Sequence, residues 1–227
     1  MSTLIGVLRE LLEKPEVSEE EVRQRLSELL ASVPRPRKMT YEEFLDWADE
    51  DTPAEWVDGE IIMVTPVSNE HQDIVDFLTS ILRTFVETRR LGRVLSAPFQ
   101  MKLARSGREP DLLFIANEHL DRLKEAFLDG PADLVVEVVS PESAGRDRGE
   151  KFYEYEAAGI PEYWLIDPVR QQSEFYQLDE TGRYHLVPPD AEGIYHSRVL
   201  PGFRLRITWL WDRPQILDAL RELGVLS

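Results

Sequence analysis

Two carboxylates occupy positions in the sequence where an acidic side chain is unusual. Glu137 interrupts the apolar run 134–139, where a buried charge is destabilising unless it is paired or binds a cation. Asp111 begins a strand directly after Pro110, which has no N–H to contribute to a sheet. If the two strands are neighbours, both carboxylates converge on one edge of the sheet, and a Mg²⁺ ion with retained waters would relieve their repulsion. The pattern predicts a metal site with Asp111 and Glu137 as its ligands.

A site of this kind becomes hydrolytic when a cation or base lies near the attacking water. Lys151 falls in the first turns of the helix expected after the Glu137 strand, so its long side chain can return to the same edge. Glu70, in the first turn of an earlier helix, is a further candidate, although an acidic residue there also stabilises the helix macrodipole. These residue types favour metal-assisted hydrolysis of a phosphodiester.

Hydrophobic periodicity predicts the elements that position these residues. A long helix is expected from residue 68 or 69 to residue 90. Strands are expected at 93–104, 110–116, 132–140 and 162–167, with a turn at Ser106–Gly107, a short helix at 118–127 and a helix at 147–158. A hairpin at 174–178 and 184–187, a strand at 203–210 and a helix at 215–223 complete the chain. Because the run 134–139 is apolar on both faces, it is typical of a central strand with helices on both sides. The expected fold is a three-layer α/β arrangement around a mixed sheet.

The first 38 residues are predicted to be separate from the main domain, 39–227. Leucines recur at helical spacing on both sides of Pro15, which indicates two amphipathic helices, and the basic stretch 34–38 reads as a stiff linker. Such an extension would dock on the domain or on a second copy of the chain. A homodimer is therefore expected as a possible state.

Composition narrows the classes of function. The formal net charge of −17 works against non-specific attraction to nucleic acid, but cations flank the predicted site at Arg105, Arg108, Arg146, Arg148 and Lys151. The chain has no cysteine, which removes thiolate zinc sites and a cysteine nucleophile. Its four histidines show no zinc-binding spacing, and no phosphate-binding glycine loop or serine-hydrolase elbow occurs. No apolar run suits a membrane span and the N-terminus has no secretory signal, so a cytoplasmic location is expected.

Several stretches carry a resemblance to a known family when they are taken in order. They are Val57-Asp58-Gly59-Glu60, Ser68-Asn69-Glu70-His71, Pro110-Asp111, Val136-Glu137-Val138-Val139-Ser140-Pro141, Asp147-Arg148-Gly149-Glu150-Lys151 and Pro161-Glu162-Tyr163-Trp164-Leu165-Ile166-Asp167-Pro168. From about residue 39 to residue 210, the chain resembles the PD-(D/E)XK nuclease superfamily and, more closely, the bacterial Uma-type family of restriction endonucleases.

The resemblance implies a restriction-endonuclease-like fold with an αβββαβ core and Mg²⁺-dependent cleavage of DNA, with Mn²⁺ as a substitute. It implies Asp111 and Glu137 as metal ligands, Glu70 as an accessory ligand or an orienting residue, and a catalytic lysine. The superfamily pattern has that lysine two positions after the glutamate, where this chain has Val139. The resemblance therefore implies Lys151 in that role, with Lys102 as the other candidate.

Two other functions are compatible with the same residues. The first is a catalytically inactive nuclease fold that binds nucleic acid or protein, which Val139 and the net charge of −17 favour. The second is a metal phosphoesterase that acts on small molecules. Cleavage of DNA and salt-sensitive DNA binding separate the three possibilities.

Overall fold

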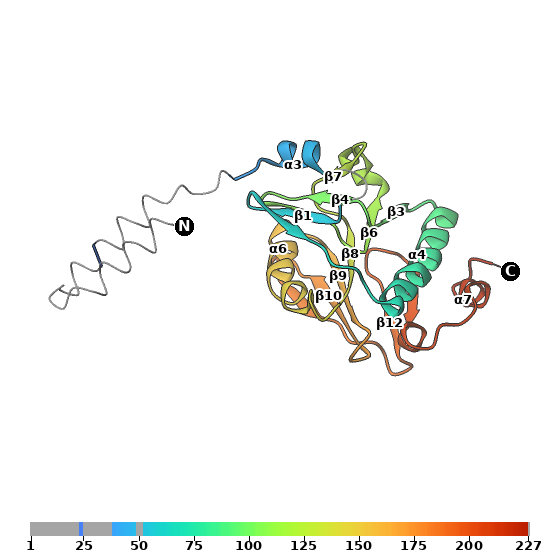
Figure 1. Ribbon diagram of the computed structural model, residues 1–227. Helices are drawn as coiled ribbons and strands as arrows, with labels where there is room; N and C mark the ends of the chain where they lie inside the picture. Colours follow the sequence, from blue (N-terminus) through green and yellow to red (C-terminus); the bar gives the residue numbers. More distant parts are fainter. Residues whose placement is uncertain (1–22, 25–37, 49–51, 227) are drawn as a thin grey trace, which may run out of the picture. The chain divides into compact units, whose positions relative to one another are not determined.

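The chain divides into two compact units, Met1–Lys38 and Met39–Ser227. The computed structural model describes residues 23–24, 38–48 and 52–226. The predicted N-terminal helices lie almost wholly outside the described residues, so the features below belong to the second unit (Figure 1). None of the helices in the described part of the chain combines the length and apolar character that a membrane span needs.

A six-stranded sheet forms the centre of the second unit. Its strands, in spatial order, are β11 (Tyr184–Leu186), β10 (Gln172–Leu178), β9 (Glu162–Asp167), β8 (Leu134–Val138), β6 (Leu112–Ala116) and β3 (Gly92–Ser96). The pair β8–β9 is parallel and the other pairs are antiparallel, so the sheet is mixed, as predicted. Strands β8 and β9 are buried along their whole length, which fits their apolar sequences and central positions.

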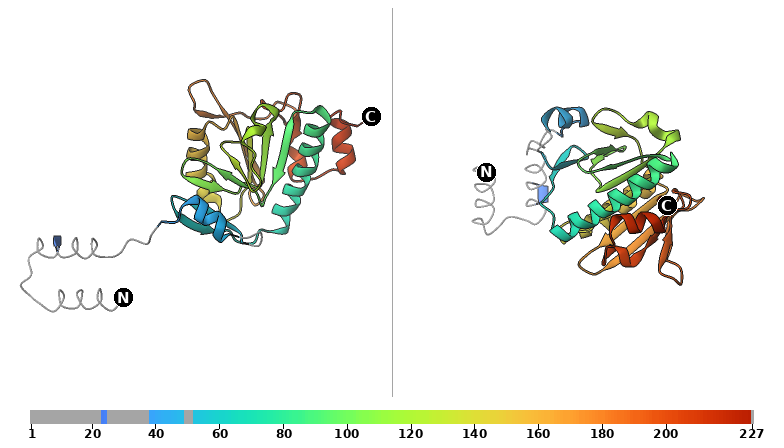
Figure 2. Two further views of the ribbon diagram at one scale, coloured as in Figure 1. Left: turned by 90° about the horizontal axis from the view of Figure 1, so that it is seen from above. Right: turned by 90° about the vertical axis from the view of Figure 1, so that its right-hand side faces the viewer.

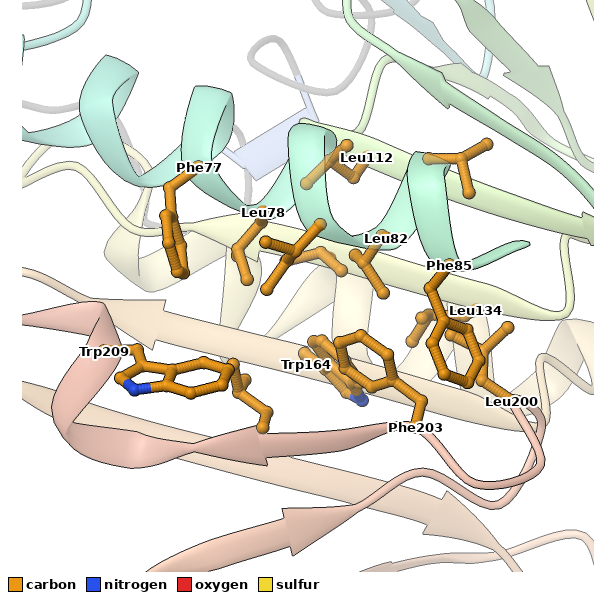
Figure 3. Packing of buried hydrophobic residues seen from close by; sticks show 14 of the residues in the cluster. Phe77, Leu78, Leu82, Phe85, Leu112, Leu134, Trp164, Leu200, Phe203 and Trp209 are labelled. Atoms are coloured by element: carbon orange, nitrogen blue, oxygen red, sulfur yellow. The ribbon is translucent and has the colours of Figure 1, made fainter. Parts of the chain in front are cut away.

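Helix α4 (Asn69–Arg89) covers one face of this sheet, with α7 (Ile216–Glu222) beside it (Figures 1 and 2). The Ser68 hydroxyl accepts a hydrogen bond from the backbone N–H of His71 and so caps the N-terminus of α4. The apolar stripe of α4 packs against side chains from the sheet and from the C-terminal segment (Figure 3). The residues of this core that the figure labels, from α4 and from the segments packed against it, are Phe77, Leu78, Leu82, Phe85, Leu112, Leu134, Trp164, Leu200, Phe203 and Trp209.

The opposite face carries α6 (Glu150–Ala158) and a second, five-stranded sheet. The strands of this sheet, in spatial order, are β2 (Glu60–Met63), β1 (Ala54–Val57), β5 (Ser106–Arg108), β4 (Gln100–Lys102) and β7 (Phe127–Asp129). Strands β1 and β2 form a hairpin whose turn residues, Asp58 and Gly59, both have positive φ, as a type I′ turn requires. Helix α3 (Tyr41–Trp47) begins with a capping box between Thr40 and Glu43.

The left view of Figure 2 shows α4 and α6 on opposite sides of the central strands. This arrangement gives the predicted three layers around a mixed sheet.

Several predicted elements are wrong in detail, and most of the errors concern the second sheet. The expected strand 93–104 is divided between β3 and β4, which belong to different sheets, and Ser106–Gly107 lies in β5 rather than in a turn. The segment 118–127 forms the 3₁₀ helix η1 (Asn117–Arg122) instead of an α-helix, and 203–210 forms β13 (Arg204–Arg206) followed by the 3₁₀ helix η2 (Ile207–Leu210). β13 pairs with β12 (Ile194–His196). Elements of three residues are too short to produce a readable period.

The predicted helix 147–158 is also two helices, α5 (Ala144–Asp147) and α6. They are separated at Gly149, where a Cβ atom would lie 2.7 Å from the backbone oxygen of Gly145. Glycine therefore allows the close backbone approach at which the chain changes direction.

A candidate hydrolytic site at the edge of the central sheet

Asp111 and Glu137 face each other across neighbouring strands. Strands β6 and β8 are antiparallel, with Leu112 opposite Val136, and one further step in this register sets Asp111 opposite Glu137. Directly opposed residues of an antiparallel pair project from the same face of the sheet. Asp111 is fixed through Oδ2, which accepts a 2.6 Å hydrogen bond from the backbone N–H of Val138. The structure thus brings together the two carboxylates that the sequence nominated.

His71 makes a second contact with Asp111. It lies in the first turn of α4 and is buried, with its Nε2 atom 3.3 Å from Asp111 Oδ2. Its Nδ1 atom is buried without a hydrogen-bond partner in the described residues. Both contacts of Asp111 use the same oxygen, so Oδ1 is available for another ligand.

The buried carboxylate of Glu137 has hydrogen-bond donors that compensate for its place in an apolar strand. The side chain is 4% exposed, and Oε1 accepts hydrogen bonds from Lys151 Nζ at 2.9 Å and from the Tyr155 hydroxyl at 2.7 Å. Burial raises the pKa of Glu137 above its ordinary value, although the Lys151 ammonium opposes this shift. Both hydrogen bonds fall on Oε1, which leaves Oε2 for a further ligand.

Lys151, in the first turn of α6, lies among three carboxylates from three different elements. Its Nζ atom is 2.9 Å from Glu137 Oε1, 3.1 Å from Glu55 Oε1 and 3.5 Å from Asp147 Oδ1. Burial alone would lower the pKa of Lys151, but the surrounding carboxylates, led by Glu137 and Glu55, outweigh burial and raise this pKa. The lysine is therefore a firmly charged hydrogen-bond donor. We call Glu55, Asp111, Glu137, Asp147 and Lys151 the acidic cluster.

The second sheet connects to the acidic cluster through Glu55 and Arg108. Glu55 Oε1 also accepts a hydrogen bond from the backbone N–H of Glu109 at 3.2 Å, and Oε2 accepts one from Arg108 Nη1 at 3.1 Å. Arg108 is 1% exposed, and its Nε atom donates to Glu154 Oε2 at 2.8 Å. Burial raises the pKa of Glu55, but Lys151 and Arg108 outweigh it and hold this pKa below the ordinary value. Glu55 is therefore a permanent negative charge that contacts the lysine.

Two residues nominated from the sequence do not join the cluster. The Glu70 carboxylate accepts hydrogen bonds from Arg213 Nη1 and Nη2 at 2.8 and 3.2 Å, on the exposed side of α4. Lys102 Nζ lies 3.5 Å from Glu42 Oε1 and over the ring of Tyr41, on the face of β4 that α3 covers. The next residue after Glu70 on α4, His71, is the one that contacts Asp111. Lys151 is the lysine that reaches Glu137.

Sequence reasoning missed four residues that surround the pair: Glu55, His71, Asp147 and Tyr155. Asp147 and Tyr155 carried a readable signal, because each lies four positions from Lys151, a spacing that places residues on one helix face. His71 has no signal of its own in the sequence beyond its place directly after Glu70. Glu55 carried no signal, since it lies in the four-residue strand β1 next to a turn.

The cations expected to flank the site are mostly neutralised. Arg105 pairs with Asp58 on the surface, and Arg148 pairs with Asp167 and Glu174. Arg108 and Lys151 are buried among carboxylates, as described above. Four of the five therefore already have acidic partners, and Arg146 is the exception among the five within the described residues.

The acidic cluster suits a hard divalent cation. Among the described residues, no three histidine, aspartate or glutamate side chains gather closely enough to hold a metal ion by themselves. Mg²⁺ does not require such a set, because it commonly takes one or two carboxylates and completes its octahedron with water and substrate oxygens. Asp111 Oδ1 and Glu137 Oε2 can supply two carboxylate oxygens of this kind. In addition, the cluster contains four carboxylates and only one ammonium, so its carboxylates outnumber its cations and favour binding of a positive ion.

The mixed sheet and the helices on its two faces define a restriction-endonuclease-like fold, which confirms the fold class predicted from the sequence. The chain matches the crystal structure of "a putative nuclease belonging to DUF820" from Anabaena variabilis with a TM-score of 0.66. The two chains are 18% identical, and the match covers 77% of this chain and 98% of the other.

The chain belongs to the Uma2 family, described as "Putative restriction endonuclease", whose family model matches residues 41–208. The resemblance drawn from the sequence motifs is thereby confirmed. A search of curated proteins found no match.

Proposed function

We propose that this protein is a Mg²⁺-dependent endonuclease that hydrolyses phosphodiester bonds in DNA, with Mn²⁺ as a substitute. The observation that supports the proposal is the opposition of Asp111 and Glu137 across β6 and β8, each with one carboxylate oxygen that accepts no hydrogen bond from the residues the structure describes. The Lys151 ammonium hydrogen-bonds to the same glutamate. Two carboxylates and one lysine at one sheet edge support metal-assisted phosphodiester hydrolysis.

Each residue then has a distinct role. Asp111 and Glu137 would hold the metal ion, and His71 and the Val138 N–H keep Asp111 in place. Bound Mg²⁺ supplies a lowered pKa for a coordinated water and stabilises charge on the phosphoryl oxygen. Lys151 acts as a hydrogen-bond donor that orients water or steadies developing negative charge, because the neighbouring carboxylates raise its pKa and keep it protonated. We therefore assign Lys151 no role as a general base.

The net reaction adds water across the phosphodiester. The oxygen of water forms a bond to phosphorus, the bond from phosphorus to the leaving oxygen breaks, and the leaving oxygen takes up a proton. Cutting both strands of a duplex requires two such sites. We therefore expect the active species to be a homodimer, with a molecular mass twice that of the 26.3 kDa chain.

The direct test is cleavage of supercoiled plasmid DNA with Mg²⁺, Mn²⁺ or EDTA. Wild-type protein should nick or linearise the plasmid only with a divalent ion. Asp111→Asn should lower the rate at least about 100-fold, as loss of a positioned electrostatic group does in other hydrolytic enzymes. Lys151→Met should do the same, and its rate is compared only under conditions where circular dichroism shows the variant folded, because removal of the buried ammonium also destabilises the protein. Glu70→Ala is the matched control, because its carboxylate pairs with Arg213 outside the cluster, and it should retain activity.

Cleavage that survives Asp111→Asn would refute the assignment. Salt-sensitive DNA binding without metal-dependent cleavage would indicate the inactive binding module instead. The position of Val139, buried in the core where the superfamily pattern has its lysine, is the observation that favours this second candidate. Turnover of nucleotide or sugar phosphates without DNA cleavage would indicate a small-molecule phosphoesterase.

A further inference from the structure

Buried polar atoms without partners concentrate at α5. In the described residues, eight buried side-chain nitrogen or oxygen atoms lack a hydrogen-bond partner, and four of them belong to the consecutive residues Arg146, Asp147 and Arg148. Leaving such an atom without a partner destabilises the folded protein. Native proteins contain few of them, so this short segment has polar atoms free to bind water or another group.

The position of this segment relates it to the acidic cluster. Helix α5 lies between β8, which carries Glu137, and α6, which carries Lys151. Asp147 is 1% exposed, and its Oδ1 atom lies 3.5 Å from Lys151 Nζ. Arg146 is thus directly bonded in the chain to a member of the cluster.

Charge distinguishes Arg146 from the other cations near the cluster. Arg105, Arg108, Arg148 and Lys151 each form an ion pair with at least one carboxylate. Arg146 forms no ion pair within the described residues, and its Nε atom is buried with no acceptor. A guanidinium prefers a planar, two-point contact with carboxylate or phosphate. The unpaired guanidinium of Arg146, on a half-buried side chain, can therefore receive an anion.

We propose that Arg146 binds a phosphate group of the DNA backbone beside the bond that is cut. The inference rests on the proposed function, since the substrate there is a phosphodiester. It also answers a difficulty of that function: a chain of net charge −17 with four carboxylates in its cluster would otherwise repel the substrate. Arg148 has a buried Nη1 atom without a partner, but Asp167 and Glu174 already hold its guanidinium. Of the five cations near the cluster, Arg146 is the one whose positive charge is unpaired within the described residues.

The test measures binding rather than cleavage. A short fluorescein-labelled DNA duplex is titrated with the full chain in Ca²⁺, and anisotropy gives the dissociation constant at several salt concentrations between about 50 and 200 mM. Arg146→Gln should weaken binding about tenfold or more and reduce the slope of log K against log salt by about one, because one phosphate contact is lost. Arg146→Lys keeps the charge but not the two-point contact. It should leave the slope unchanged and weaken binding by a smaller factor.

Arg93→Gln is the matched control. It makes the same change of charge at an exposed position on β3, opposite Ile115 and so towards the end of the β3–β6 pair remote from Asp111. It should leave both the affinity and the slope at wild-type values. Thermal unfolding should show that Arg146→Gln is folded, because the substitution removes no ion pair seen in the described residues.

The outcomes separate this inference from the proposed function. Wild-type affinity and slope in Arg146→Gln, together with metal-dependent cleavage by the wild type, would overturn the inference alone and indicate that ordered water satisfies Nε. Equal losses in Arg146→Gln and Arg93→Gln would also overturn it, because the effect would then reflect total charge. Absence of both binding and cleavage in the wild type would overturn both proposals.

Discussion

Replacing Lys151 with methionine should destabilise the protein strongly. Methionine preserves much of the apolar length of the side chain but removes the ammonium that lies between Glu137, Glu55 and Asp147. Each of these carboxylates is at least nine-tenths buried, so none can recover its lost partner by turning to solvent. Breaking a buried ion pair by removing one partner typically costs about 3–5 kcal/mol. For a domain of this size, that corresponds to a decrease of about 10 °C in the melting temperature.

The measurement is urea unfolding at neutral pH, followed by tryptophan fluorescence. The double variant Lys151→Met with Glu137→Gln should regain a substantial part of the lost free energy of unfolding, because it removes the uncompensated charge as well. The Tyr155 hydroxyl can still donate to the amide oxygen of the glutamine. Lys102→Met is the control, because the contact of Lys102 with Glu42 at 3.5 Å is largely exposed and should contribute less than about 1 kcal/mol.

Two results would refute this reasoning. The first is a Lys151→Met protein whose free energy of unfolding lies within about 1 kcal/mol of the wild-type value, which is the range of a surface pair. The second is a double variant no more stable than Lys151→Met, which would show that the charge of Glu137 is not what the lysine compensates.

Three further predictions concern other parts of the domain. Glu70→Ala should change the free energy of unfolding by less than about 1 kcal/mol, because its ion pair with Arg213 is exposed. A larger loss in urea unfolding would contradict the description of this pair as an exposed one. Gly92→Ala should lower the free energy of unfolding by about 3 kcal/mol, because the alanine Cβ would lie 2.0 Å from a backbone oxygen of β6. If the variant melts at the wild-type temperature, β3 and β6 can move apart without cost and the prediction is wrong. Asp167→Asn tests a pKa: burial raises the pKa of Asp167, but the Arg170 N–H and Arg148 outweigh burial and lower it. Because a lowered carboxyl pKa stabilises the fold above the unfolded-state value of about 4, the difference between wild type and Asp167→Asn should be full at pH 7 and shrink as the pH falls below that value. A difference that stays constant from pH 7 to pH 3 would contradict the lowered pKa.

The sequence identified the centre of the candidate site because burial and charge conflict there. Glu137 in an apolar strand required a partner, and the structure supplies Lys151 and Tyr155. The pairing of β6 with β8 then places Asp111 opposite it, but this pairing is a long-range property that local pattern does not specify. Glu70 was chosen for its charge, whereas the helix turns its neighbour His71 towards Asp111. Which residue of a helix turn faces the site depends on how the helix packs on the sheet.

The central layer was predictable and the second sheet was not, for one physical reason. Strands β8 and β9 are long, apolar and buried on both faces, so composition alone indicates them. Strands β4, β5 and β7 have three residues each and contain polar residues such as Gln100 and Ser106 that tertiary contacts bury. Glu55 belongs to this same sheet. Its contact with Lys151 was therefore invisible from the sequence for the same reason that its strand was.

The acidic cluster draws its members from both sheets and from α5 and α6, and this has a consequence for biosynthesis. A ribosome delivers Glu55 first, then Asp111 and Glu137, and Lys151 last of these. Until α6 has emerged, the carboxylates lack the ammonium that holds them together, and a growing chain cannot assemble the arrangement proposed to cut DNA.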